Sequence, residues 1–308
     1  MTLDPAYLEY PMRRKGMDHD FYAWSDLHRR PALSWPGGCR VAVAIVVSLE
    51  WFPIMPAADA PFRAPGHMQT AYPDLRHYTA REYGTRIGFY RMLNAFARMG
   101  VKVSVATNAA IAQRYPSIID DLLADGHEIV AHSTDMDGTI DSSLAEERER
   151  ELITRSLDIL ERSTGVRPRG WMSIARSQSF QTARLLKEAG VEYMCDWPND
   201  DLPYRFDTPA GPIVNVPINH ELSDRQIITV QQHSADSYAE QIQDAYRWLA
   251  SENAPRMLPL HVTPYILGLP YRMGAFENLL EWLASQDDSG FLTTAEIAGS
   301  LPAAPDQE

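Results

Sequence analysis

Three predicted strands each carry an ionisable side chain near the carboxyl end. The apolar run 40–49 leads into Glu50, a short run of small apolar residues leads into His132, and the run 257–262 contains His261. In parallel sheets, catalytic groups gather at the carboxyl ends of the strands. A carboxylate and two imidazoles at such an edge can activate water and protonate a leaving group near neutral pH. We therefore predict that Glu50, His132 and His261 are catalytic.

The same residues also suggest a metal site. Asp137 lies five positions after His132, so Glu50, His132 and Asp137 together offer one nitrogen and two oxygen ligands. This donor set suits a divalent zinc, manganese or iron ion that activates a water on an open position. Because Asp137 precedes a glycine, it is equally typical of a turn. The sequence leaves open one divalent metal or none.

Three further residues stand at predicted strand ends. Trp171 follows Gly170, Asp196 ends the run 191–196, and Thr263 shares a strand face with His261, two positions away. A tryptophan or an aspartate of this kind also occurs as a packed core residue or an ion-pair partner. We predict that Trp171, Asp196 and Thr263 contact the substrate.

Strands and helices alternate along most of the chain. This pattern favours a parallel sheet of about seven strands covered by helices, closed or nearly closed into an α/β barrel. We expect an aromatic N-terminal arm over 1–38, the barrel over 39–300 and a short tail over 301–308. The predicted helices span 79–99, 108–114, 117–124, 144–164, 180–189, 237–251 and 274–285.

Composition narrows the kinds of partner. The 308 residues carry a formal net charge of −13, which argues against nucleic acid and anionic membranes as partners. Cys39 and Cys195 match no metal or redox spacing, and no run approaches the roughly 18 apolar residues of a membrane span. The first residues lack the pattern of a secretory leader. We expect a cytoplasmic protein that acts on a small molecule.

Several segments together resemble the polysaccharide deacetylase (NodB-homology) family, especially its allantoinase-like branch. The similarity runs from about Pro36 to Ile297. It rests on the segments 48–50, 83–88, 125–132, 164–171, 195–204 and 264–272. The resemblance implies a distorted (β/α) barrel that hydrolyses a carbon–nitrogen bond other than a peptide bond.

The chain departs from the usual family pattern at three places. Glu50 stands where the family has an aspartate, and Met136 stands where its second metal-binding histidine is expected. Thr263 takes the place of the histidine before Pro-Tyr, while His261 lies two residues earlier. The allantoinase-like branch also lacks the second histidine, which implies chemistry without a metal.

Three functions remain open at this point. The first is hydrolysis of a small amide, for example a cyclic imide or ureide, with Glu50 activating water, His261 protonating the leaving nitrogen, and Trp171 and Arg272 shaping the pocket. The second is metal-dependent N-deacetylation of an amino sugar or its conjugate. The third is a catalytically inactive barrel that only binds a ligand. The aromatic arm and the resemblance favour a homo-oligomer.

Overall fold

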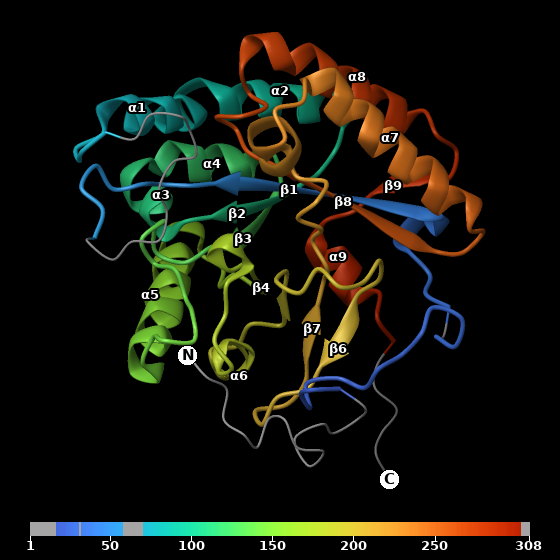
Figure 1. The fold of residues 1–308 in the computed structure, drawn as a ribbon, viewed down its shortest axis with the longest axis horizontal. Helices are drawn as coiled ribbons and strands as arrows, with labels where there is room; N and C mark the ends of the chain where they lie inside the picture. Colours follow the sequence, from blue (N-terminus) through green and yellow to red (C-terminus); the bar gives the residue numbers. More distant parts are fainter. Residues whose placement is uncertain (1–16, 31, 58–69, 303–308) are drawn as a thin grey trace.

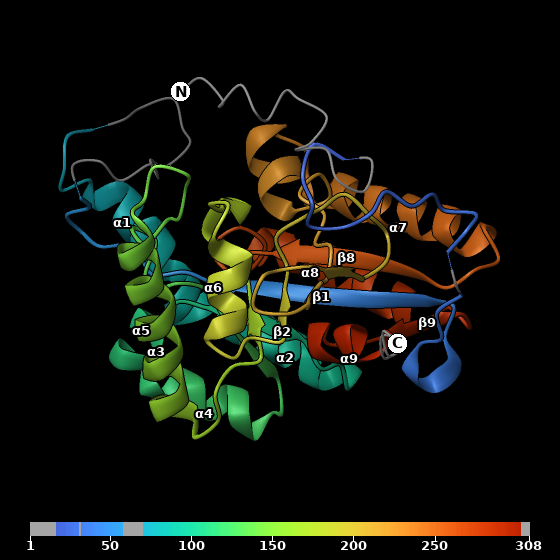
Figure 2. The same cartoon turned by 90° about the horizontal axis from the view of Figure 1, so that it is seen from below.

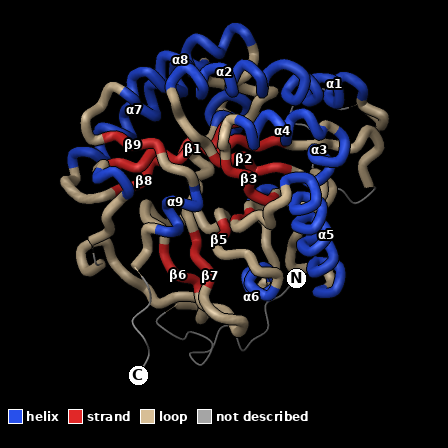
Figure 3. Tube along the Cα trace, turned by 180° about the vertical axis from the view of Figure 1, so that it is seen from behind, coloured by secondary structure: helices blue, strands red, loops and turns tan. Residues whose placement is uncertain are grey.

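The computed structural model describes residues 17–30, 32–57 and 70–302, which form an α/β half-barrel (Figure 1). The strands are β1 (Val41–Leu49), β2 (Ser104–Thr107), β3 (Glu128–Ala131), β4 (Gly170–Trp171), β5 (Tyr193–Met194), β6 (Tyr204–Phe206), β7 (Ile213–Asn215), β8 (Arg256–Val262) and β9 (Ser289–Phe291). The helices are α1 (Leu75–Tyr83), α2 (Phe89–Met99), α3 (Ala109–Arg114), α4 (Pro116–Ala124), α5 (Glu146–Thr164), α6 (Thr182–Glu188), α7 (Ala235–Ser251), α8 (Pro270–Ala284) and α9 (Thr294–Gly299). Most of the helices arch around the outside of the strands, whereas α9 lies inside the arc (Figure 3).

The sheet confirms the predicted α/β barrel and defines how far it closes. Its order is β6-β7-β5-β4-β3-β2-β1-β8, with β9 also paired to β1, and β8 does not pair with β6. All pairs are parallel except β6 with β7. The prediction of about seven strands omitted β6 and β9. Both are three residues long, too short to stand out as a hydrophobic run.

Strand β1 is the centre of the fold and shows how polar groups reach its interior. All nine of its residues are buried, and it runs beside β8 between the flanks formed by α5 and α7 (Figure 2). Successive side chains point to opposite faces. Val41, Val43, Ile45, Val47 and Leu49 pack against the helices, whereas Ala42, Ala44 and Val46 belong to the inner cluster of the half-barrel. Ser48 and Glu50 continue the inner row.

The neighbouring strands aim their last residues at the same interior. On β8, Met257 lies in the inner cluster, so His261 and Thr263 share its face. On β3, Val130 lies in that cluster and His132 follows it on the same side. Parallel pairing aligns the carboxyl ends, with Val46 opposite His261. The strands therefore bring the three predicted catalytic residues to one edge.

The predicted helix 79–99 is interrupted in the structure. Residues Gly84–Gly88 form a π-helical segment between α1 and α2. A Cβ atom on Gly88 would lie 2.2 Å from the carbonyl oxygen of Pro264, so only glycine permits this approach. Periodicity alone could not reveal the break, because the cause is contact with the distant turn 264–268.

The described part of the predicted N-terminal arm packs against the barrel. Phe21 stacks on Phe206 with ring centroids 4.6 Å apart, and Tyr22 meets Trp197 edge to face. The rest of the arm, residues 1–16, and most of the predicted tail, residues 303–308, lie outside the described residues. Among the described helices, none is both long enough and apolar enough to cross a membrane.

Candidate active site

The Glu50 carboxylate is held by two residues from other parts of the chain. The Arg225 Nη2 donates to its two oxygens at 2.8 and 3.0 Å, and the Tyr265 hydroxyl donates to Oε2. Arg225 begins the π-helical segment Arg225–Val230, and Tyr265 lies in the turn after β8. Arg225 also donates to the Tyr265 hydroxyl oxygen at 2.7 Å. The buried carboxylate is thus matched by a guanidinium and a phenol, as a buried charge requires.

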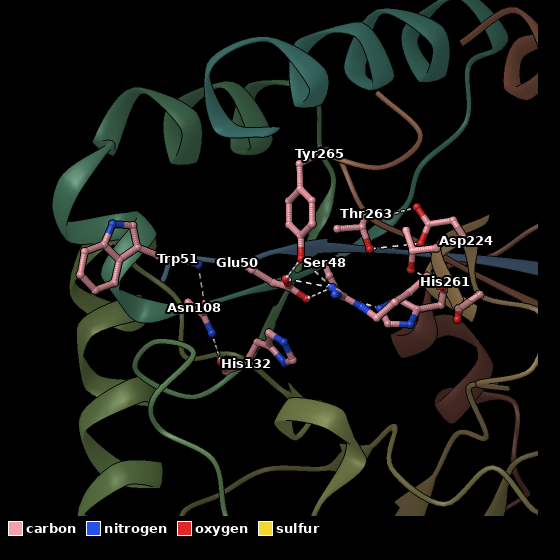
Figure 4. A network of polar contacts seen from close by, with 12 residues as sticks. Ser48, Glu50, Trp51, Asn108, His132, Asp224, His261, Thr263 and Tyr265 are labelled. Carbon is pink, nitrogen blue, oxygen red and sulfur yellow. Dashed lines mark hydrogen bonds and ion pairs between the residues drawn. The ribbon is translucent and has the colours of Figure 1, made fainter. Parts of the chain in front are cut away.

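His132 lies beside Glu50, Arg225 and Tyr265 and keeps one ring nitrogen without a hydrogen bond to the described residues. Its Nδ1–H donates to the carbonyl oxygen of Met172 at 2.6 Å. Its Nε2 has no hydrogen-bond partner in the described part of the chain, and in Figure 4 the ring lies on the opposite side of Glu50 from Tyr265. Burial lowers the pKa of His132, against the opposing effect of the negative charge on Glu50. His132 is therefore neutral near pH 7 and keeps a lone pair on Nε2.

His261 has both ring nitrogens engaged. Arg176 Nη2 donates to its Nδ1 at 3.0 Å, so Nε2 carries the proton and donates to the Ser48 hydroxyl oxygen at 2.6 Å. Burial, together with the positive charges of Arg176 and Arg225, holds the pKa of His261 well below its usual range. Its role as a proton donor stays a prediction. In this arrangement the ring holds Ser48 and Arg176 in place.

Two polar side chains join the strand ends. The Asn108 amide oxygen accepts the backbone N–H of Trp51 at 2.8 Å, and its NH₂ group donates to the His132 carbonyl oxygen (Figure 4). Asp224 accepts the backbone N–H of Thr263 at 2.6 Å and its hydroxyl at 3.1 Å. Burial raises the pKa of Asp224 to about 7. Asn108 thus connects β1 to β3, and Asp224 holds the end of β8 next to Arg225.

The four residues predicted to contact the substrate each form a hydrogen bond with another part of the protein. Trp171 is wholly buried in the core and donates from its indole N–H to the Ser173 hydroxyl at 2.9 Å. Asp196 accepts the backbone N–H of Ser173 at 2.6 Å, and burial raises its pKa to about 6. Arg272, in the first turn of α8, donates to the Ile266 carbonyl oxygen at 2.9 Å. Thr263 contacts Asp224. Substrate contact by these four residues stays a prediction.

The predicted metal ligands do not form a coordination set. Asp137 accepts the backbone N–H of Ala57 at 2.7 Å, and Glu50 is occupied by Arg225 and Tyr265. Within the described ranges, no group of three or more His, Cys, Asp or Glu side chains is placed to hold a metal ion. A guanidinium bound to a carboxylate also opposes a cation there. The residues present therefore do not fit the zinc, manganese or iron site, and we derive no step through a metal.

Sequence reasoning missed Arg225, Tyr265, Asn108, Asp224 and Arg176 as members of the site. Tyr265 lies within the quoted segment 264–272, so the resemblance contained a signal for it. Arg225 is separated from Glu50 by 175 residues and lies in a segment without regular periodicity. No pattern in the sequence connects the two.

Two cavities border the cluster of polar side chains formed by Glu50, Arg225, Tyr265, His132, His261 and Arg176. A small one of about 20 Å³ lies between Glu50, Phe52 and Arg81, whose guanidinium stacks 3.6 Å above the Phe52 ring. A larger one of about 460 Å³ reaches the cluster through Arg176. An apolar cavity of about 520 Å³ lies under the N-terminal arm, but none of its lining residues belongs to the cluster. We therefore associate the first two with the chemistry.

Residues 82–194 match the family model described as polysaccharide deacetylase. The chain is 28% identical, over 90% of its length and 97% of the other chain, to a polysaccharide deacetylase-type crystal structure from Pseudomonas aeruginosa PAO1, with a TM-score of 0.78. The chain therefore contains a polysaccharide deacetylase domain. The crystal structure of PuuE allantoinase is also 28% identical, covers 90% of this chain and 96% of its own, and has a TM-score of 0.78.

A curated polysaccharide deacetylase-type protein of Schizosaccharomyces pombe is 23% identical over 70% of this chain and 73% of its own length. Together these similarities identify this protein as a polysaccharide deacetylase-like hydrolase of carbon–nitrogen bonds other than peptide bonds. They leave its substrate open, because the relatives include deacetylases and an allantoinase.

Proposed function

We propose that this hydrolase opens a small cyclic amide, such as an imide or a ureide, without a metal ion. One observation carries the proposal. His132 keeps a free Nε2 lone pair beside Glu50, whose carboxylate is bound by Arg225 and Tyr265. A base is thus available where the family pattern has a metal ligand. The similarity to an allantoinase gives independent support for a cyclic ureide.

The proposed reaction starts with water bound beside His132. Nε2 takes a proton as the water oxygen attacks the carbonyl carbon, and the ring C–N bond then breaks. The proton on His132 passes to the leaving nitrogen, so one water is consumed and one carboxyl group and one nitrogen–hydrogen bond are formed. Glu50 accepts a ring N–H of the substrate, and Arg225 holds that carboxylate in position.

Purified protein would be assayed with succinimide, hydantoin and dihydrouracil, and in parallel with N-acetylated chitotetraose, each with and without a chelator. We expect ring opening that survives the chelator. We expect the His132→Gln and Glu50→Gln variants to lose about 10²-fold or more in kcat/KM. His233→Gln and Glu151→Gln, which change an exposed histidine and an exposed glutamate, are the matched controls.

The pH profile tests the assignment of the base. We expect kcat/KM to rise with pH through a value below 6.5, because burial lowers the pKa of His132. Release of acetate from the sugar only with added divalent metal would instead support the deacetylase. Tight binding of a ureide with no turnover by the wild type would support the inactive barrel. The cytoplasmic location and the homo-oligomer stay predictions.

A further inference from the structure

Arg176 carries a positive charge that no carboxylate neutralises directly. Its Nε donates to the Ile218 carbonyl oxygen at 2.9 Å and its Nη2 to His261 Nδ1 at 3.0 Å, both uncharged acceptors. Within the described residues, Nη1 has no hydrogen-bond partner and the guanidinium forms no ion pair. Burial lowers the pKa of Arg176, which means that its surroundings disfavour the charge. An anion is what this half-buried guanidinium lacks.

The cavity of about 460 Å³ next to Arg176 has the size and walls of a small-molecule site. Phe21, Phe180 and Trp197 supply flat apolar surface that suits a planar ring. Asp196 also lines the cavity, but it is only 2% exposed, and its oxygens accept hydrogen bonds from Ser173 and Gln178. The charge of Asp196 acts on Arg176 and raises the pKa of the guanidinium, but among the described residues the two side chains form no ion pair, and Arg176 keeps a donor free.

The backbone is strained where it presents this arginine. Ala175 and Arg176 have φ values of 53° and 55°, in the left-handed region that residues with a Cβ atom disfavour. Such a conformation is unfavourable, because the Cβ atom comes too close to the backbone. Strain of this kind persists where the surrounding structure enforces it, and it clusters at ligand sites. Here it accompanies a guanidinium held between the Ile218 carbonyl, His261 and the cavity.

We propose that Arg176 binds a carboxylate of the substrate, so that the natural substrate is a cyclic amide bearing an anionic group. The ring part of this inference rests on the proposed function. Arg176 touches His261, which touches Ser48, and Ser48 shares the inner face of the first strand with Glu50. Arg176 therefore joins the cavity to the inner row that carries Glu50. Arg176 is thus the residue that distinguishes an anionic substrate from a neutral one.

The test uses two planar cyclic ureides that differ only in a carboxylate, orotate and uracil. Isothermal titration calorimetry measures their binding to the wild type, Arg176→Met, Arg176→Lys and the control Arg184→Met, whose arginine pairs with Glu146 and Glu188. We expect the wild type and the control to bind orotate about 10- to 100-fold more tightly than uracil. Arg176→Met should abolish that preference, and Arg176→Lys should retain part of it.

Equal affinity of the wild type for orotate and uracil would overturn the inference, even if Arg176→Met failed to fold. A preference that survives in a folded Arg176→Met would overturn it as well. Because neither ligand has to be hydrolysed, the result is independent of turnover. Hydrolysis of dihydrouracil without an anion preference would leave the proposed function standing and refute only the role of Arg176.

Discussion

The ion pair between Glu50 and Arg225 offers a direct test of how the site is held. The Glu50 side chain is 5% exposed and that of Arg225 is 20% exposed. Replacing Arg225 by methionine leaves a buried carboxylate whose remaining hydrogen-bond donor among the described side chains is the Tyr265 hydroxyl. Breaking a buried pair in this way costs about 3–5 kcal/mol, and the partial exposure of Arg225 points to about 3 kcal/mol. Arg225→Met should therefore lose about a quarter or more of a typical unfolding free energy.

The double variant Glu50→Gln, Arg225→Met removes both charges. We expect it to recover about 2 kcal/mol relative to the sum of the single variants, because no unpaired charge remains.

Urea unfolding of the wild type, the two single variants and the double variant gives each free energy. The control is Arg150→Met, which breaks surface pairs with Glu146 and Glu188 and should cost about 1 kcal/mol or less. Additive effects of the two single variants in the double variant would refute the reasoning.

Three further predictions concern the residues that support the site. Burial raises the pKa of Asp224 from 3.8 to about 7, so its folded form binds a proton that the unfolded form releases, and stability is lost as the pH rises between these values. The asparagine of Asp224→Asn stays neutral, so its unfolding free energy should gain at most about 4 kcal/mol relative to the wild type between pH 4 and pH 8. Thermal unfolding measures this difference, and a pH dependence equal to that of the wild type would contradict the prediction. Gly88→Ala should lose more than about 2 kcal/mol of unfolding free energy in urea denaturation, because the new Cβ would lie 2.2 Å from the Pro264 carbonyl oxygen. A urea midpoint equal to that of the wild type would argue against the close approach. Asn108→Ala should lower stability by about 1–3 kcal/mol and also kcat, since the carbonyl of His132 loses its donor; normal kcat in a destabilised variant would separate the two effects.

The strand ends were predictable from the sequence because they depend on local pattern and on general rules for parallel sheets. The run 40–49 is apolar throughout, so its burial and the position of Glu50 at its end follow directly. The alternation of strands and helices predicted the barrel for the same reason. The sequence analysis missed strands β6 and β9 because a strand of three residues is too short to show a hydrophobic period.

The sequence by itself therefore determined the fold class, the family resemblance and the positions of Glu50, His132 and His261 along the inner row of the barrel. Only the tertiary structure decided what surrounds them: Arg225 and Tyr265 on the carboxylate, the Met172 carbonyl on His132, and Arg176 on His261. The physical reason is the separation along the chain between the residues that interact. Backbone periodicity acts over a few residues, whereas the charge state and orientation of a buried side chain depend on partners that the folded chain brings from far away.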